Sequence, residues 1–211
     1  MKGKSYYFFK RIIDILGASV LIIILSPILL VISLAIKLDS KGEIVFKQRR
    51  LGRYGKQFWI YKFRTMCVGA ENMGDGQYCK QGDSRVTRVG KVLRKTSLDE
   101  LMQLFNILKG DMSFIGPRPP LTYHPWSIDE YTPEQMKRFD VRPGITGLAQ
   151  ISGRKHLEWP KRIEYDVRYV ENISLWLDIK ICFITAFKVL FMLDNENTEE
   201  STKPKTTKQV R

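Results

Sequence analysis

Residues 15–36, ILGASVLIIILSPILLVISLAI, decide the fold of this chain, because these twenty-two positions hold no charged side chain. A transmembrane helix needs about 20 apolar residues, so the stretch is long enough to enter a membrane. Pro27 interrupts it, since proline lacks the N–H that would bond the carbonyl of Ile23 and its ring crowds that turn. We therefore expect a helix that bends at Ser26-Pro27.

Two membrane arrangements are compatible with this stretch. Each half beside Ser26-Pro27, at about 1.5 Å per residue, is too short for a hydrocarbon core roughly 30 Å thick. Basic residues flank both ends, with Lys10 and Arg11 before the stretch and Lys37 and Lys41 after it, so the positive-inside rule assigns no direction across the bilayer. A re-entrant helix-break-helix satisfies both observations, and the alternative is a single span with a proline kink.

The composition favours one basic domain that faces the cytosol. At 211 residues the chain suffices for one domain with its own core. Its formal charge of +13 favours anionic partners. This charge belongs to the body of the protein, because four acidic and four basic residues offset each other from Asp194 to Arg211. Three cysteines without a CxxC pair indicate a reducing compartment.

Several common site types are absent from the sequence. The two histidines lie beside no cysteine, so no zinc-ligand spacing exists. There is no GxGxxG motif, and Gly55-Lys56 is followed by Gln57 where a Walker A motif needs Ser or Thr. A hard cation held by oxygen ligands stays compatible with the sequence.

The body combines one hairpin with several helices. Residues 44–48 and 58–65 are rich in β-branched and aromatic side chains around a glycine-containing turn, which predicts a β-hairpin. A 3.6-residue apolar period through residues 101–108 predicts a helix that ends at Gly110. Thr132 followed by Pro133 predicts another helix start, and residues 159–170 predict a further helix.

The apolar stretch 175–191 contains Asp178, Lys180 and Lys188. These charges are too frequent for a membrane span, whereas the stretch is too apolar for a well-solvated helix. An interfacial helix explains the composition. A buried core helix is the alternative.

An acidic pair, Asp99-Glu100, stands in a segment whose other charges are positive. Ser97-Leu98-Asp99-Glu100 fits a capping box, in which Ser97 caps the helix and Glu100 bonds back to the Ser97 N–H. The functional interpretation uses the same location: a carboxylate there can bind Mg²⁺ beside substrate phosphates, or act as a nucleophile on phosphorus. Both interpretations remain open at these four residues.

Arginines near glycines and prolines could hold phosphate. Arg118 lies between Pro117 and Pro119, which suits bidentate phosphate binding but also fits a stiff surface loop. Arg142 and Arg154 flank a glycine-rich segment where the backbone can approach a ligand closely.

Together these elements resemble the bacterial sugar transferases, specifically the small monotopic phosphoglycosyl transferases that begin glycoconjugate assembly on a polyprenol carrier. The resemblance covers roughly residues 8–190, in the family's order. The matching motifs are Phe9-Lys10-Arg11-Ile12-Ile13-Asp14, Ser26-Pro27, Tyr61-Lys62-Phe63-Arg64-Thr65-Met66, Leu93-Arg94-Lys95-Thr96-Ser97-Leu98-Asp99-Glu100-Leu101, Leu108-Lys109-Gly110-Asp111-Met112-Ser113, Gly116-Pro117-Arg118-Pro119 and Val141-Arg142-Pro143-Gly144-Ile145-Thr146-Gly147. One departure is Leu148, where many relatives carry Trp.

The resemblance implies a two-step reaction with Mg²⁺. Asp99 would attack the sugar-bearing phosphate of a UDP-sugar, bind the metal and release UMP, and undecaprenyl phosphate would then accept the sugar phosphate. Glu100 would assist. The residues implied to neutralise phosphate charge are Lys62, Arg94, Arg118, Arg142 and Arg154. Ser26 and Pro27 would break the re-entrant helix, and Lys10 and Arg11 would meet membrane phospholipids.

The expected fold is therefore helix-rich α+β. It comprises a re-entrant membrane helix over residues 1–40, a catalytic domain with a small β-hairpin and amphipathic interfacial helices over 41–193, and a disordered tail over 194–211. The resemblance places the protein on the cytoplasmic face of the bacterial inner membrane, and a homodimer is compatible with it.

Two rival functions stay open. One is direct transfer, in which Asp99 only binds the metal. The other is a non-enzymatic, membrane-tethered basic protein that binds nucleic acid. The acidic pair argues against the second, because it repels a phosphate backbone, and we expect no nucleic-acid partner.

Overall fold

A computed structural model describes residues 4–73, 82–153 and 157–191. Its helices and strands follow the chain in this order: α1 (Lys4–Asp39), β1 (Val45–Leu51), β2 (Gln57–Phe63), α2 (Arg88–Thr96), α3 (Gln103–Lys109), β3 (Ser113–Ile115), α4 (Pro133–Met136), β4 (Gly144–Thr146), α5 (Leu148–Ile151), α6 (Trp159–Asn172) and α7 (Leu175–Leu190). The fold is helix-rich α+β, as the sequence predicts, and it contains two small sheets. The predicted tail, residues 194–211, lies outside the described residues.

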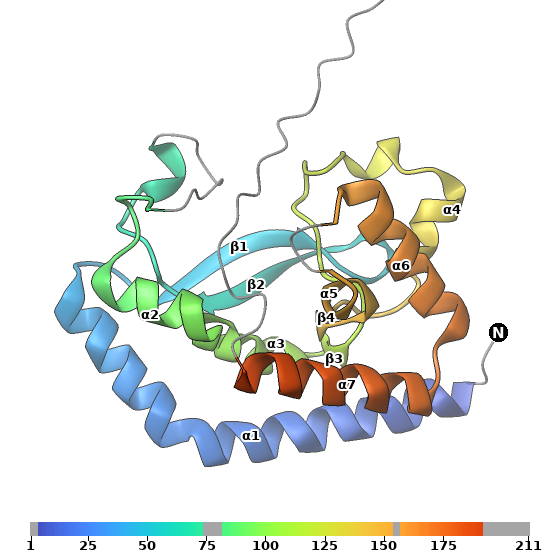
Figure 1. Ribbon diagram of the computed structural model, residues 1–211, viewed down its shortest axis with the longest axis horizontal. Helices are drawn as coiled ribbons and strands as arrows, with labels where there is room; N and C mark the ends of the chain where they lie inside the picture. The colour runs from blue at the N-terminus through green and yellow to red at the C-terminus, as the bar shows by residue number, and fades with distance from the viewer. Residues whose placement is uncertain (1–3, 74–81, 154–156, 192–211) are drawn as a thin grey trace, which may run out of the picture.

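Helix α1 is one continuous helix of 36 residues with Pro27 inside it. Figure 1 shows that its second half turns up along the side of the molecule. The Ser26 hydroxyl donates to the Ile23 carbonyl at 2.7 Å, and this is the carbonyl that the missing N–H of Pro27 would have bonded. The helix therefore bends at proline without leaving that acceptor unsatisfied.

The length and composition of α1 are sufficient to cross a membrane. Only 11% of its most apolar window is buried against the rest of the protein, so α1 is not the core helix of a water-soluble fold. Most of its large apolar side chains point outward, including Phe9, Ile13, Ile23 and Leu30.

Both halves of α1 nevertheless contact the body. Ala18 is fully buried in a cluster with Ile107 of α3, while Ile36 packs with Leu93 of α2. At the end of the helix, Asp39 accepts a hydrogen bond from the backbone N–H of Val89 at 3.0 Å. The body therefore rests along most of the length of α1.

The predicted hairpin is confirmed. Strands β1 and β2 pair antiparallel, with Val45 opposite Phe63 and Leu51 opposite Gln57. The connecting turn places Tyr54 and Gly55 at positive φ. This left-handed turn reverses the chain within a few residues.

A second sheet was not predicted. Strands β3 and β4 pair in parallel, with Ser113 beside Gly144 and Ile115 beside Thr146. A side chain at position 144 would lie 2.1 Å from the backbone N of Gly116. The close approach that Gly144 permits is therefore between two segments of the protein itself.

Several predicted helix boundaries are confirmed. Helix α3 ends at Gly110, whose φ of 97° closes it in the left-handed conformation. Thr132 caps α4 with Pro133 in the first turn, and α6 covers the predicted helix at 159–170.

Helix α7 packs beside α1 along one edge of the molecule (Figure 1). Its inner side buries Asp178 and Ile181. Its outer side exposes Trp176, Phe183 and Leu190. The alternative of a fully buried core helix is therefore wrong, and an interfacial position in a membrane stays a prediction.

Candidate active site

The acidic pair lies in a short 3-10 helix, Leu98–Met102, between α2 and α3. The preceding residue, Ser97, has a φ of 59° and closes α2. Its side chain makes no capping hydrogen bond to the 3-10 helix, so the predicted capping box is wrong. The left-handed conformation at Ser97 differs from the extended backbone that an N-cap requires, and Glu100 binds other partners.

Glu100 is held by two cations from different parts of the chain. Its Oε1 accepts hydrogen bonds from Lys62 Nζ at 3.0 Å and from Arg118 Nη2 at 2.9 Å. Burial alone would raise the pKa of Glu100, but the charges and hydrogen bonds of Arg118 and Lys62 outweigh it and hold the pKa well below its usual value. Glu100 is therefore a firmly ionised anchor for both cations.

Asp99 is held much more loosely. Its nearest cation, Lys62 Nζ, lies 3.8 Å from Oδ2, and its carboxylate accepts no hydrogen bond from the residues that the structure describes. Burial raises the pKa of Asp99, Lys62 opposes that shift, and the charge of Glu100 adds to it. The two carboxylates thus differ in their environments, which assigns them different roles.

Lys62 is positioned through a buried amide that the sequence interpretation missed. Asn106 on α3 is 0% exposed, and its side chain accepts from the N–H of Tyr61 at 2.9 Å and donates to the carbonyl of Trp59 at 2.7 Å. These two bonds fix β2 against α3. They thereby also fix the distance between Lys62 on β2 and the acidic pair. In the sequence, the sign of this role is that Asn106 is a polar residue within an apolar helical period.

The backbone of Arg118 is held by a buried ion pair that the sequence analysis also missed. Arg138 Nη2 donates to Asp166 Oδ2 at 2.6 Å and to the backbone carbonyl of Arg118 at 3.0 Å. The side chains of Arg138 and Asp166 are 1% and 2% exposed. Sequence separation hides such a contact, since the two residues belong to different elements.

Arg94 lies on α2 and contributes positive charge near Asp99, whose pKa it lowers against the larger effect of burial. Its Nε donates to Thr65 Oγ1 at 2.9 Å. Gly90 lets α2 approach closely there, because an added Cβ would lie 2.0 Å from the Thr65 carbonyl oxygen. Lys62, Arg94 and Arg118 are therefore grouped around the acidic pair, and their role in binding phosphate stays a prediction.

Of the other two predicted phosphate residues, Arg142 lies elsewhere. Arg142 Nε donates to the carbonyl of Gly110 at 2.8 Å, which is at the opposite end of α3 from the acidic pair. Arg154 lies outside the described residues, so its role stays a prediction.

Lys10 and Arg11 both have partners within the protein. Lys10 forms an ion pair with Asp178 of α7 at 2.6 Å. Arg11 donates to the carbonyls of Ile107 and Leu108 at 2.7 and 3.0 Å, where its charge also suits the C-terminal end of α3. Their predicted contact with lipid headgroups stays a prediction, beside this direct structural role.

The acidic pair fits Mg²⁺ if one carboxylate binds the ion and substrate phosphates and water complete its coordination. Mg²⁺ in proteins is bound by one or two carboxylates together with substrate phosphates and water. The described residues contain no group of three or more His, Cys, Asp or Glu side chains that could form a complete metal cage. Asp99, whose oxygens accept no hydrogen bond in the described structure, fits the role of the single carboxylate ligand.

The fold and site define a small α+β protein with one membrane-compatible helix and a carboxylate pair surrounded by cations. The sequence profile of the bacterial sugar transferases matches residues 5–192. The chain belongs to the bacterial sugar transferase family.

Three relatives illustrate the family. A UDP-glucose:undecaprenyl-phosphate glucose-1-phosphate transferase of Klebsiella pneumoniae is 49% identical over 185 residues, covering 85% of this chain and 40% of the relative. A UDP-N-acetylgalactosamine-undecaprenyl-phosphate N-acetylgalactosaminephosphotransferase of Aeromonas hydrophila is 46% identical over 188 residues, covering 88% and 44%. The chain thus spans about two fifths of these two relatives. The uncharacterized sugar transferase EpsL of Bacillus subtilis is 43% identical over 181 residues. The match covers 86% of this chain and 87% of EpsL.

Proposed function

We propose that this protein transfers a sugar 1-phosphate from a UDP-sugar to undecaprenyl phosphate and releases UMP, through a covalent phosphosugar on Asp99. The names of the relatives from Klebsiella pneumoniae and Aeromonas hydrophila support the reaction class. The asymmetry of the acidic pair carries the mechanism: two cations hold Glu100, while Asp99 accepts no hydrogen bond from the described residues. A carboxylate with available lone pairs can act as a nucleophile.

In the first step an Asp99 oxygen attacks the phosphorus that carries the sugar. The new bond joins this oxygen to that phosphorus, and the bond between the phosphorus and the bridging oxygen of UMP breaks. UMP leaves with the electron pair on its phosphate oxygen. The products are UMP and an acyl phosphate between Asp99 and the sugar phosphate.

In the second step a phosphate oxygen of undecaprenyl phosphate attacks the same phosphorus. The bond to Asp99 breaks, and the carboxylate is regenerated with its electron pair. The lipid product is a diphosphate that carries the sugar. Neither step requires an oxidant or a net proton, because each exchanges one phosphorus–oxygen bond for another.

The cations around the pair support the binding of a diphosphate there. Lys62 and Arg118 converge on Glu100, and Arg94 stands beside Thr65. Glu100 orients the ends of Lys62 and Arg118, which then stabilise the charge that develops on the phosphate oxygens. Arg154 is proposed to join them, and Asp99 to hold Mg²⁺, which would supply charge neutralisation on the diphosphate.

The arrangement of α1 supports a re-entrant helix on the cytoplasmic face of the inner membrane. Arg11, in its first half, bonds the end of α3, while Asp39, at its last residue, bonds the start of α2. A helix that crossed the bilayer would carry one half away from the body. The contacts at both ends therefore support an arrangement in which the two ends of α1 and the acidic pair face the same side of the membrane, where the lipid-phosphate acceptor is proposed to bind.

The test is exchange of labelled UMP into UDP-sugar without any lipid acceptor. The protein is incubated with Mg²⁺ and either UDP-glucose or UDP-N-acetylgalactosamine, the donors that the relatives' names give. A covalent intermediate makes the first step reversible alone, so we expect exchange. Asp99→Asn should abolish it, and the exposed carboxylate Asp129 provides the matched control Asp129→Asn, which should leave it unchanged.

Direct transfer, with Asp99 as a metal ligand only, gives a different result. UMP would then be released only when undecaprenyl phosphate is present. Lipid-dependent product formation without any UMP exchange would contradict the covalent route while leaving the overall transfer reaction intact. A homodimer and contact with phospholipids are compatible with both routes.

A further inference from the structure

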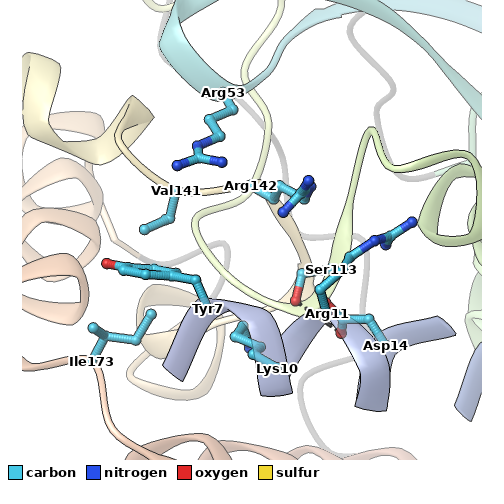
Figure 2. A pocket seen from close by; sticks show the side chains of 9 residues that line it. All are labelled: Tyr7, Lys10, Arg11, Asp14, Arg53, Ser113, Val141, Arg142 and Ile173. Carbon is cyan, nitrogen blue, oxygen red and sulfur yellow. Dashed lines mark hydrogen bonds between the residues drawn. The ribbon is translucent and has the colours of Figure 1, made fainter. Parts of the chain in front are cut away.

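A second cationic cavity lies apart from the acidic pair. It is a small hollow that opens to solvent. Its lining comes from the first half of α1, from the turn after β1, and from the segment before β4 (Figure 2). The charged residues of this cavity are Lys10, Arg11, Asp14, Arg53 and Arg142.

The two carboxylates near this cavity, Asp14 and Asp178, already have partners within the protein. Asp14 accepts from the Ser113 hydroxyl at 3.0 Å and from the N–H of Phe114 at 3.1 Å. Lys10 is paired with Asp178 at 2.6 Å. The three arginines therefore share a cavity in which only Asp14 carries an opposite charge.

Two of these arginines are held in a way that leaves their binding ends available. Arg53 bonds the Asp140 carbonyl through Nε at 3.1 Å, and Arg142 bonds the Gly110 carbonyl through Nε at 2.8 Å. The terminal NH₂ groups of both make no hydrogen bond with the described residues. A guanidinium fixed at Nε presents these two groups as a fork, which is the geometry that binds phosphate oxygens.

Helix capping accounts for only part of this cluster. Arg11 caps the end of α3 through both terminal nitrogens, and Arg142 adds one bond to Gly110. Arg53 bonds the carbonyl of Asp140, at the end of the short 3-10 helix Lys137–Phe139, through Nε, and its terminal groups take no part in that contact. Burial lowers the pKa of Arg142, and the nearby charges of Arg11 and Arg53 add to this shift, as like charges that share a cavity do.

We infer that Arg53 and Arg142 form a second phosphate-binding site, which takes a phosphate monoester or diester at the opposite end of α3 from the acidic pair. The bound anion offsets the repulsion among the three arginines. The site lies against α1, whose outer side exposes Phe9 and Ile13, so a lipid headgroup could supply the phosphate as well as a free anion. The inference is independent of the proposed reaction, because neither Asp99 nor Glu100 takes part.

The test measures binding of radiolabelled inorganic phosphate to the full-length protein in a nonionic detergent by equilibrium dialysis. We expect saturable binding that weakens at least tenfold in Arg53→Gln/Arg142→Gln. The variant Lys161→Gln/Arg168→Gln also removes two positive charges, both from exposed positions on α6, and should stay within twofold of the wild type. Unfolding temperatures check that each variant is folded. If Arg53→Gln/Arg142→Gln is not, Arg53→Gln alone, in the turn between β1 and β2, should weaken binding several-fold.

Competition then separates the two sources of phosphate. Displacement by phosphatidylglycerol in mixed micelles, but not by the detergent alone, identifies a headgroup site. Competition by unlabelled phosphate without any effect of the lipid identifies a site for a free anion. The inference is overturned if the wild type binds no phosphate, if Arg53→Gln/Arg142→Gln binds as the wild type does, or if Lys161→Gln/Arg168→Gln weakens binding as much as that variant does.

Discussion

At the residue scale, two adjacent carboxylates are given different environments. Glu100 receives hydrogen bonds from Lys62 and Arg118, whereas Asp99 accepts no hydrogen bond from the described residues and pairs with Lys62 at the longer distance of 3.8 Å. The pKa of Glu100 is lowered and that of Asp99 is raised. One side chain therefore organises cations, and its neighbour keeps lone pairs for chemistry.

The raised pKa of Asp99 predicts a pH dependence. Only the ionised carboxylate attacks phosphorus, so the rate of UMP release in a single turnover should fall as pH drops through the raised pKa. Lys62→Met removes a charge that lowers this pKa. The rate profile should then move to higher pH, in addition to any loss of rate from weaker substrate binding.

The measurement is the single-turnover rate of UMP release over about pH 4 to 8, a range chosen around the ordinary carboxyl value. A lower plateau with an unmoved midpoint would show that Lys62 binds substrate without acting on Asp99. A midpoint displaced to lower pH would contradict the electrostatic account.

At the element scale, the site depends on contacts between segments far apart in sequence. Asn106 joins α3 to β2, and Arg138 joins the Arg118 loop to α6 through Asp166. Removing one partner of a buried ion pair typically costs about 3–5 kcal/mol, whereas replacing both with apolar residues is often neutral.

Comparing a single with a double substitution of Arg138 and Asp166 therefore separates their contribution to folding stability from their role in positioning Arg118. Asp166→Leu should destabilise the fold by about 3–5 kcal/mol, and Arg138→Met/Asp166→Leu should recover most of that loss. The double variant still lacks the hydrogen bond to the Arg118 carbonyl, so its transfer rate should stay below that of the wild type. Chemical denaturation and the rate assay on the same samples test this, and full recovery of the rate with stability would show that Arg138 positions nothing.

The elements that the sequence predicts well are those with local signals. The β-hairpin, the end of α3 at Gly110 and the cap of α4 at Thr132 each depend on residues a few positions apart. The β3–β4 pair depends on strands about thirty residues apart and only three residues long, so no periodicity indicated it. The capping box was wrong because Ser97 ends one helix in a left-handed conformation instead of beginning the next.

The candidate site shows the same division. The family motifs selected Lys62, Arg94 and Arg118, and the structure groups all three around the acidic pair. They also selected Arg142, which instead lies near Gly110 and Arg53. Arg138, Asp166 and Asn106 support the site from the core, where motif spacing does not distinguish a positioning residue from a packing residue.

At the scale of the whole molecule, α1 and α7 present their apolar sides along one edge while the acidic pair stays with the body. The contacts at both ends of α1 predict that the two chain termini lie on the same side of the membrane. Tags at each terminus should both be inaccessible to a membrane-impermeant reagent in intact cells and accessible after lysis.

Pro27→Ala provides the matched variant for this topology. Restoring the N–H of residue 27 removes the cause of the bend, so a larger fraction of the N-terminal tag should become accessible from outside. A wild-type N-terminal tag already accessible in intact cells would contradict the re-entrant arrangement and favour a single span.

The measurement that tests the central claim most directly is the intact mass of the protein after incubation with UDP-sugar and Mg²⁺, without undecaprenyl phosphate. The account predicts a mass increase of one sugar phosphate per chain, a stoichiometric amount of UMP, and neither product with Asp99→Asn. An unmodified chain that still forms the lipid product once undecaprenyl phosphate is added would contradict Asp99 as the nucleophile.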